Sequence, residues 1–139
     1  SSVTKLKSKI REYGCNNILF SDAIRRDEMI NEYKKADILF LHLNNYNAFK
    51  KVLPSKIFEY AATGKPIWAG VDGYAKKFLN HEVVGSWVFE PSNLCSAIKS
   101  FKLIKNSWSD RELFIKKYDR NNIQENLVDD ILSIVKVVD

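Results

Sequence analysis

The segment from Pro54 to Glu59 combines a predicted helix start with side chains that can bind an anion and a diol. Pro54 fixes the chain entering the helix, and Ser55 is a candidate N-cap residue whose hydroxyl would accept a free backbone N–H. A helix N-terminus attracts anions, above all phosphate, and Lys56 adds a mobile positive charge. Glu59 lies one turn further, and its carboxylate can accept hydrogen bonds from two neighbouring hydroxyls, as in ribose. From spacing alone, a capped helix with a solvated lysine and glutamate fits the same pattern.

Alternating helical and strand patterns are expected to position this segment. Expected strands are 18–20, 36–43, 66–70 and 86–89, and expected helices are 3–13, 27–33, 55–63, 74–79, 92–101, 108–118 and a last one from about 122. This alternation predicts an α/β domain with a doubly wound, mostly parallel, Rossmann-like sheet. In such sheets ligands bind beyond the carboxyl ends of the strands, so the loops 21–25, 44–55, 70–74 and 90–93 are the expected site.

The composition excludes several classes of protein. The 139 residues include only two cysteines, five glycines and three prolines, which excludes a disulfide scaffold and collagen-like or disordered chains. There is neither an apolar stretch long enough to span a bilayer nor a signal-peptide pattern. The net charge is 22 − 17 = +5, which suits an anionic ligand or a membrane surface, but the charges are not clustered and no nucleic-acid partner is expected.

Three runs of sequence, taken in order, carry a resemblance to a known family. The runs are ADILFL at 36–41, LPSKIFEY at 53–60 and ATGKPI at 62–67. They resemble the C-terminal half of glycosyltransferase family 4, the group-1 glycosyltransferases of GT-B fold. The motif PSKIFEY resembles that of the bacterial members of the family, which build O-antigen, capsule and other surface polysaccharides. Further agreement at 17–20, 26–29, Tyr33, 85–91 and 118–120 extends the resemblance over nearly the whole chain.

The resemblance implies a retaining transfer of sugar from a UDP- or GDP-linked nucleotide-sugar donor, without a cofactor or a metal. In the family, the glutamate at the position of Glu59 binds the donor ribose. The residues at the start of its helix, here Pro54, Ser55 and Lys56, face the diphosphate and the donor sugar. No catalytic residue is assigned by this comparison.

The remaining donor-binding candidates lie where the chain departs from the family pattern. The loop after the expected strand 18–20 would contact the base through Ala23 and Ile24, although Asp22 stands where the family often has glycine. The family has a second glutamate eight residues before the ribose-binding one, and this chain has Lys51 there. The contact to the donor sugar is therefore expected to be altered or moved.

The chain is expected to be one half of a two-domain enzyme, cut from a longer protein. It opens without an initiator methionine, and the family's first strand, its glycine-rich turn and the acceptor-binding N-terminal domain have no counterpart in it. Residues 1–120 are expected to form the nucleotide-sugar-binding domain, incomplete at its N-terminal end, and 121–139 a helix packing on it. Its expected partners are that N-terminal domain and a lipid-linked or saccharide acceptor. The expected location is the cytoplasm, at the inner face of the membrane, and transfer by the isolated chain is not expected.

Two other functions stay open. A nucleotide-sugar 2-epimerase shares the GT-B fold and would need acidic residues and histidines clustered in the cleft. The other is a GT-B half that only binds a partner chain. Lys51, in the place of the family's first glutamate, is the feature that favours it. These alternatives predict different outcomes when the chain is mixed with nucleotides.

Residues outside the family motifs carry weaker chemical signals. Cys15 and Cys95 form no CxxC unit, so no metal site is predicted. His42 closes a strand near the expected site and is either a contact to the donor sugar or a strand-end histidine. Trp87 and Trp108 are expected in the core, as large aromatic side chains usually are.

Overall fold

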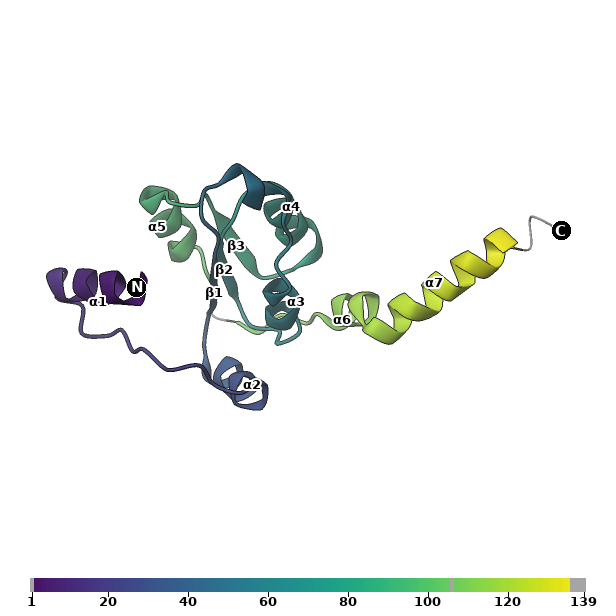
Figure 1. The fold of residues 1–139 in the computed structure, drawn as a ribbon, viewed down its shortest axis with the longest axis horizontal. Helices are drawn as coiled ribbons and strands as arrows, with labels where there is room; N and C mark the ends of the chain where they lie inside the picture. Colours follow the sequence, from purple (N-terminus) through teal and green to yellow (C-terminus); the bar gives the residue numbers. More distant parts are fainter. Residues whose placement is uncertain (1, 106, 136–139) are drawn as a thin grey trace. The chain divides into compact units, whose positions relative to one another are not determined.

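The computed structural model describes residues 2–105 and 107–135 (Figure 1). Its contacts divide the chain into two compact units, Ser1–Asn31 and Glu32–Asp139. The boundary between them falls inside helix α2, which runs from Arg26 to Lys35. The expected division into 1–120 and 121–139 stays a prediction.

Unit 1 consists of helix α1, Ser2–Glu12, an irregular segment and the first turns of α2. The prediction of a strand at 18–20 was wrong, because these residues have no regular structure and Leu19 is 95% exposed. A β-strand needs a partner for its backbone groups, and the described part of unit 1 contains no other strand. The apolar run Ile18–Phe20 is therefore left in contact with solvent.

Unit 2 is built on an open sheet of three parallel strands, which confirms the predicted α/β class. The strands are β1, Leu39–His42, β2, Ile67–Gly70, and β3, Ser86–Phe89, in the order β1-β2-β3. The register pairs Leu39 with Ile67 and Ile67 with Ser86. Three of the four expected strands are thus present within the described residues.

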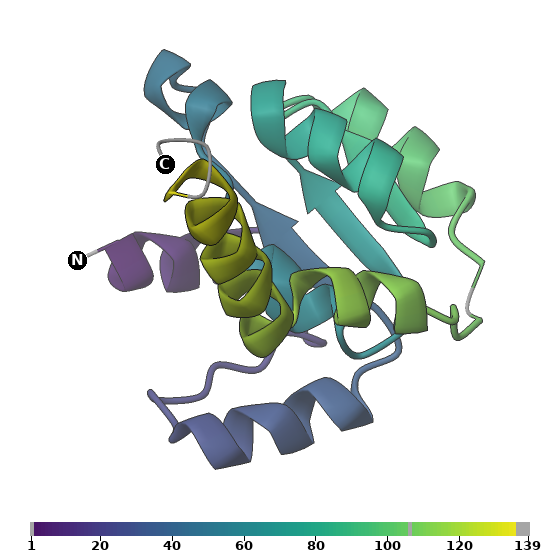
Figure 2. The same ribbon diagram turned by 90° about the vertical axis from the view of Figure 1, so that its right-hand side faces the viewer.

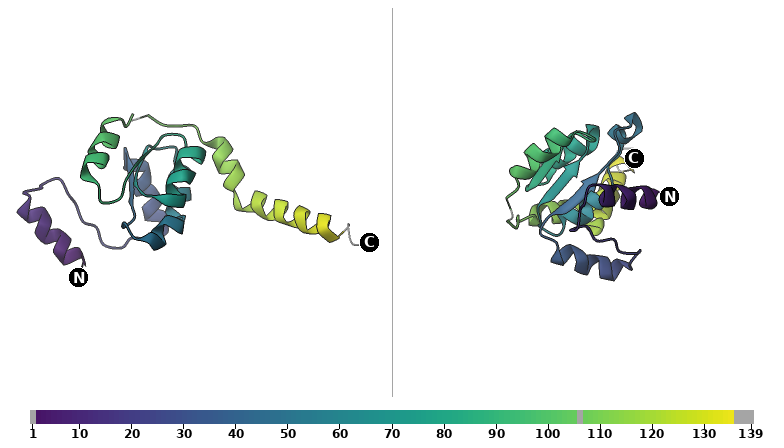
Figure 3. Two further views of the ribbon diagram at one scale, coloured as in Figure 1. Left: turned by 90° about the horizontal axis from the view of Figure 1, so that it is seen from above. Right: turned by 90° about the vertical axis from the view of Figure 1, so that its left-hand side faces the viewer.

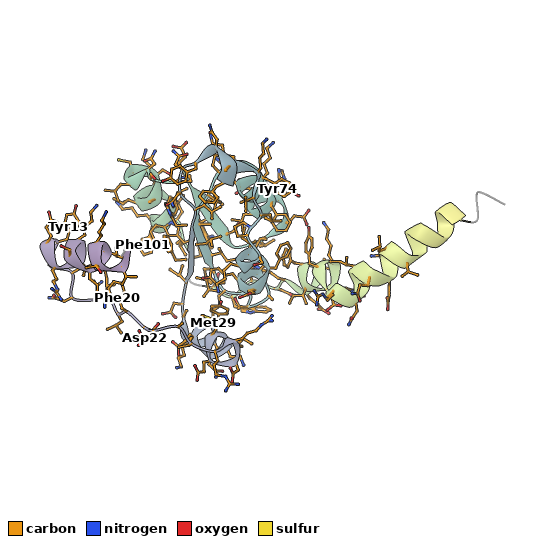
Figure 4. All side chains as sticks on the ribbon, in the orientation of Figure 1. Tyr13, Phe20, Asp22, Met29, Tyr74 and Phe101 are labelled. Atoms are coloured by element: carbon orange, nitrogen blue, oxygen red, sulfur yellow. The ribbon has the colours of Figure 1, made fainter. Side chains whose placement is uncertain are left out.

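Helices cover both faces of this sheet. In Figures 1 and 3, α3, Lys56–Ala61, and α4, Gly73–Glu82, lie on one face, and α5, Leu94–Lys102, lies on the other. Figure 4 labels Tyr74 on α4 and Phe101 on α5, and the Phe101 ring lies 5.1 Å from the ring of Trp68 on β2. Side chains of a strand alternate between the two faces, so each face receives every second residue.

The main core lies between the sheet and the pair α3 and α4. Its largest fully buried side chains are Ile57, Ile67, Val71 and Leu79. The opposite face carries aromatic side chains, and Phe40 of β1 is packed 5.0 Å from Trp68 but stays 50% exposed. The α5 face is therefore less completely covered at β1 than the α3–α4 face.

The prediction that Trp108 lies in the core was wrong, since its side chain is 68% exposed. The indole lies against Gly64, where a Cβ atom would collide with it, and the Ser109 N–H donates to the Gly64 carbonyl at 2.8 Å. Trp108 therefore packs on the surface of a backbone turn. Trp87 of β3 is half-buried.

The last two helices are α6, Glu112–Tyr118, and α7, Arg120–Val135, which follow each other and meet at an angle at Asp119 (Figures 1 and 2). The helix expected from residue 108 begins only at Glu112, because the backbone of Arg111 is not helical and Asp110 accepts the Glu112 N–H through its side chain at 2.9 Å. The C-terminal helix was expected over 121–139. The structure shows it as α7, and the last expected residues, 136–139, lie outside the described residues. No helix in the described ranges has the length and apolar character needed to cross a bilayer.

Candidate functional site

The loops that follow the three strands share a cleft of about 510 Å³. In open parallel sheets, this carboxyl edge is where ligands usually bind. The cleft is lined by Asn45, Lys50, Asp72 and residues 90–95. Lys50 belongs to a short 3₁₀ helix, η1, at Asn47–Lys51, in the loop between β1 and α3.

Charged groups in the cleft are paired with one another or with amides. The Lys50 ammonium lies 3.4 Å from a carboxylate oxygen of Asp72. The Gly73 N–H is the main cause that lowers the pKa of Asp72, and Lys50 adds to it. Glu90 accepts a hydrogen bond of 2.9 Å from the Asn93 side chain. The cleft thus contains one cation and two carboxylates, a set that does not favour an anion.

His42 closes β1 beside the same edge of the sheet. Its Nε2 accepts a hydrogen bond of 3.4 Å from the backbone N–H of Ser92, whose φ of 63° is in the left-handed region. This backbone contact agrees with the second alternative for His42, a histidine that ends a strand and is satisfied within the protein. Contact with a donor sugar stays untested.

Lys56 and Glu59, two of the predicted donor-binding residues, form a cluster with two tyrosines outside the lining of this cleft. Tyr33 donates from its hydroxyl to Glu59 Oε2 at 3.1 Å, and the Lys56 ammonium lies 3.6 Å from the same oxygen. That ammonium also lies 5.4 Å from the centre of the Tyr33 ring and 6.0 Å from that of Tyr60. A cation and a carboxylate thus lie side by side on α3.

The electrostatics of this cluster keep Lys56 charged. The Tyr33 hydroxyl is the main cause that raises the pKa of Lys56, and Glu59 adds a smaller effect. Burial raises the pKa of the Tyr60 phenol. At neutral pH the cluster therefore presents the Lys56 ammonium beside the neutral Tyr60 phenol.

The predicted N-cap at Ser55 was wrong. Ser55 already has helical dihedrals, φ −55° and ψ −28°, and its side chain makes no capping hydrogen bond. The reason is that Pro54 opens the first turn, because its carbonyl accepts the Ile57 N–H at 3.0 Å. The Lys56 ammonium, in the first turn of α3, is a group available for an anion.

The other predicted residues lie in separate places. Lys51 ends η1 and is exposed. Ala23 and Ile24 belong to the irregular segment of unit 1 that precedes α2, where Ala23 is exposed and Ile24 is half-buried. Of the seven predicted residues, the structure brings Lys56 and Glu59 into contact through their side chains.

Sequence reasoning assigned no role to Tyr33, Asp72 or Glu90, although the expected site loops 70–74 and 90–93 contain Asp72 and Glu90. Tyr33 was a position of the helix expected at 27–33 and belonged to the family resemblance, without a role at the site. Asp72 and Glu90 follow the ends of β2 and β3 by two residues and one residue, a position that could have identified them. The described residues contain no group of three or more histidines, cysteines or carboxylates that could hold a metal ion.

Comparison with known proteins leaves the family undetermined. No family model, no curated protein and no solved structure matches the chain.

Proposed function

We propose that this chain is the donor-binding half of a retaining glycosyltransferase that uses a nucleotide sugar, with the GT-B fold of family 4. The proposal is supported by the ordered motifs, by the parallel α/β sheet and by the position of PSKIFEY after β1. The observation that carries it is the Lys56–Glu59 pair, in which an ammonium and a carboxylate oxygen lie 3.6 Å apart. Such a pair can bind a phosphate and a neighbouring diol of one ligand.

In this proposal, each predicted residue has one role toward the donor. Lys56 binds the diphosphate beside Ser55, and Glu59 accepts hydrogen bonds from the ribose hydroxyls. The assignment of Ala23 and Ile24 to the base stays a prediction from the resemblance, and Lys51 lies where the sugar contact differs from the family pattern. Pro54 holds the start of α3, since its carbonyl forms the first turn.

The acceptor side belongs to a second domain. The proposed reaction builds a surface polysaccharide, such as an O-antigen or a capsule, at the cytoplasmic face of the membrane. The acceptor is a lipid-linked sugar or a saccharide bound by the partner domain. The isolated chain then binds the donor without transferring its sugar.

Calorimetric titration with UDP, GDP, UDP-glucose and GDP-mannose tests the proposal. We expect at least one of these ligands to bind, and Glu59→Ala to weaken that binding about 10-fold, which corresponds to about 1.4 kcal/mol. Glu112→Ala, at an exposed glutamate on α6, is the matched control and is expected to bind like the wild type. Absence of binding, or equal binding by Glu59→Ala and the wild type, would contradict the proposal.

A nucleotide-sugar 2-epimerase is the second candidate, and one observation favours it. Asp72 and Glu90 line the cleft, and His42 contacts Ser92, which also lines it, so acidic residues and a histidine lie at one edge of the sheet, as this reaction needs. Proton NMR of UDP-N-acetylglucosamine incubated with the chain would detect the C2 epimer. A chain that binds no nucleotide and forms no epimer would instead favour a module that only binds a partner protein.

A further inference from the structure

We propose that Tyr33 is a positioning residue for the donor site, which holds one carboxylate oxygen of Glu59 and leaves the other for hydroxyls of the ligand. This inference rests on the proposed function, because it assigns a role within the same site. It concerns a residue outside the PSKIFEY segment, on α2 rather than on α3.

The geometry separates an anchored oxygen from an available one. The Tyr33 hydroxyl and the Lys56 ammonium both contact Glu59 Oε2, at 3.1 Å and 3.6 Å. Within the described part of the chain no contact to Glu59 Oε1 is present, so this oxygen keeps its lone pairs for another donor. A carboxylate held at one oxygen keeps a fixed direction for the other.

The burial of the two partners fits this division of roles. Tyr33 is only 8% exposed, whereas the Glu59 side chain is 41% exposed. The ring of Tyr33 is further fixed by an edge-to-face contact with Tyr60, with 5.3 Å between the ring centres. A buried, immobilised hydroxyl therefore holds a side chain that a ligand can reach.

Tyr33 also places the cation of the site. The Lys56 ammonium lies over the Tyr33 ring, at 5.4 Å from its centre, a distance typical of a cation–π contact. The Tyr33 hydroxyl is the main cause of the raised pKa of Lys56. One tyrosine thus sets the positions of both a hydrogen-bond acceptor and a positive charge, the two groups that a ribose and an adjoining phosphate need.

Tyr33→Phe is the direct test, because it removes the hydroxyl and keeps the ring. We expect this variant to bind UDP or GDP, whichever the wild type prefers, 3- to 10-fold more weakly in calorimetry. In a Glu59→Ala background the same substitution is expected to cause no further loss, because Tyr33 acts through Glu59. Tyr74→Phe, at a half-exposed tyrosine on α4, is the matched control.

A second readout needs no ligand. NMR titration of the Lys56 side chain in the free protein is expected to give a lower pKa in Tyr33→Phe than in the wild type, since the main cause of its rise is gone. A purely structural role for Tyr33 would lower the unfolding midpoint and leave the pKa of Lys56 unchanged.

The outcomes separate the two proposals. If the wild type binds a nucleotide through Glu59 but Tyr33→Phe binds equally well, the positioning role is overturned and the proposed function stands. If the wild type binds neither UDP nor GDP, the donor-site proposal fails, and the positioning role toward a ligand fails with it. The Lys56 titration then shows only whether Tyr33 holds the cation.

Discussion

The guanidinium of Arg111 donates to the backbone carbonyl of Ala61 at 3.1 Å, which places a buried cation at the carboxyl end of α3. Arg111 is only 4% exposed, and its other donors reach the carbonyls of Val84 at 2.7 Å, Lys65 at 3.0 Å and Gly85 at 3.3 Å. Burial lowers the pKa of Arg111 to about 10, so it remains charged at neutral pH. A single side chain therefore ties the end of α3 to the segments that lead into β2 and β3.

Arg111→Met is expected to lower the free energy of unfolding by about 2–4 kcal/mol, because it leaves buried carbonyls without a donor. Urea denaturation followed by circular dichroism measures this change. Arg120→Met, at an exposed arginine that begins α7, is the control and is expected to stay within about 0.5 kcal/mol of the wild type. A similar effect of both substitutions would show that the four carbonyl contacts contribute little.

Gly73→Ala is expected to destabilise the protein more than Gly64→Ala. Both glycines have left-handed backbones, with φ of 63° and 73°, so alanine is strained at either position. At Gly73 the added Cβ would meet the backbone of Lys50, whereas at Gly64 it would meet the exposed side chain of Trp108. We expect a loss of about 1 kcal/mol at Gly64 and about 2–4 kcal/mol at Gly73 in urea denaturation. Equal losses would mean that η1 moves away from α4 at little cost.

The α/β class could be predicted because the three paired strands are short apolar runs separated by helical patterns. Leu39–His42, Ile67–Gly70 and Ser86–Phe89 each lie within an expected strand. The run at 18–20 has the same local pattern but remains irregular. Apolar character indicates that a segment can form a strand, but pairing depends on a partner elsewhere in the fold.

The candidate site was only partly predictable from sequence. Spacing along one helix predicted that Ser55 and Glu59 share a face, whereas the side chain that contacts Glu59 is that of Lys56, three residues before it. The contact of Glu59 with Tyr33 joins residues 26 positions apart and depends on how α2 packs, which no local pattern contains. The missed cap at Ser55 has a different cause, since Pro54 begins the turn one residue earlier than expected.

Acid is expected to destabilise the protein partly through Asp72. The Gly73 N–H, and then Lys50, lower the pKa of Asp72 below its ordinary value of 3.8. The stabilisation from this carboxylate is therefore present above about pH 4 and is lost as the pH falls through its lower pKa in the folded protein. Asp72→Asn is expected to reduce stability at pH 7, to approach the wild type as the pH falls through that lowered pKa, and so to flatten the acid limb of the stability curve.

The two causes of the Asp72 shift can be separated with Lys50→Met. This variant removes the ammonium 3.4 Å from Asp72 but keeps the Gly73 N–H, so most of the acid dependence is expected to remain. Urea denaturation of the three proteins between pH 2 and 7 provides the comparison. An acid limb in Asp72→Asn as steep as that of the wild type would exclude Asp72 as a contributor.

Tyr60→Phe is expected to weaken the outer edge of the sheet. The Leu39 N–H donates toward β2, to the Pro66 carbonyl at 2.9 Å, so the backbone groups of Phe40 point to the opposite side of β1, where the described residues form no neighbouring strand. The Tyr60 hydroxyl donates to the Phe40 carbonyl at 3.3 Å and partly satisfies this edge. Removing the hydroxyl is expected to cost about 0.5–1.5 kcal/mol in urea denaturation. Tyr74→Phe is the matched control, and a loss no larger than in that variant would mean that solvent replaces the Tyr60 hydroxyl without cost.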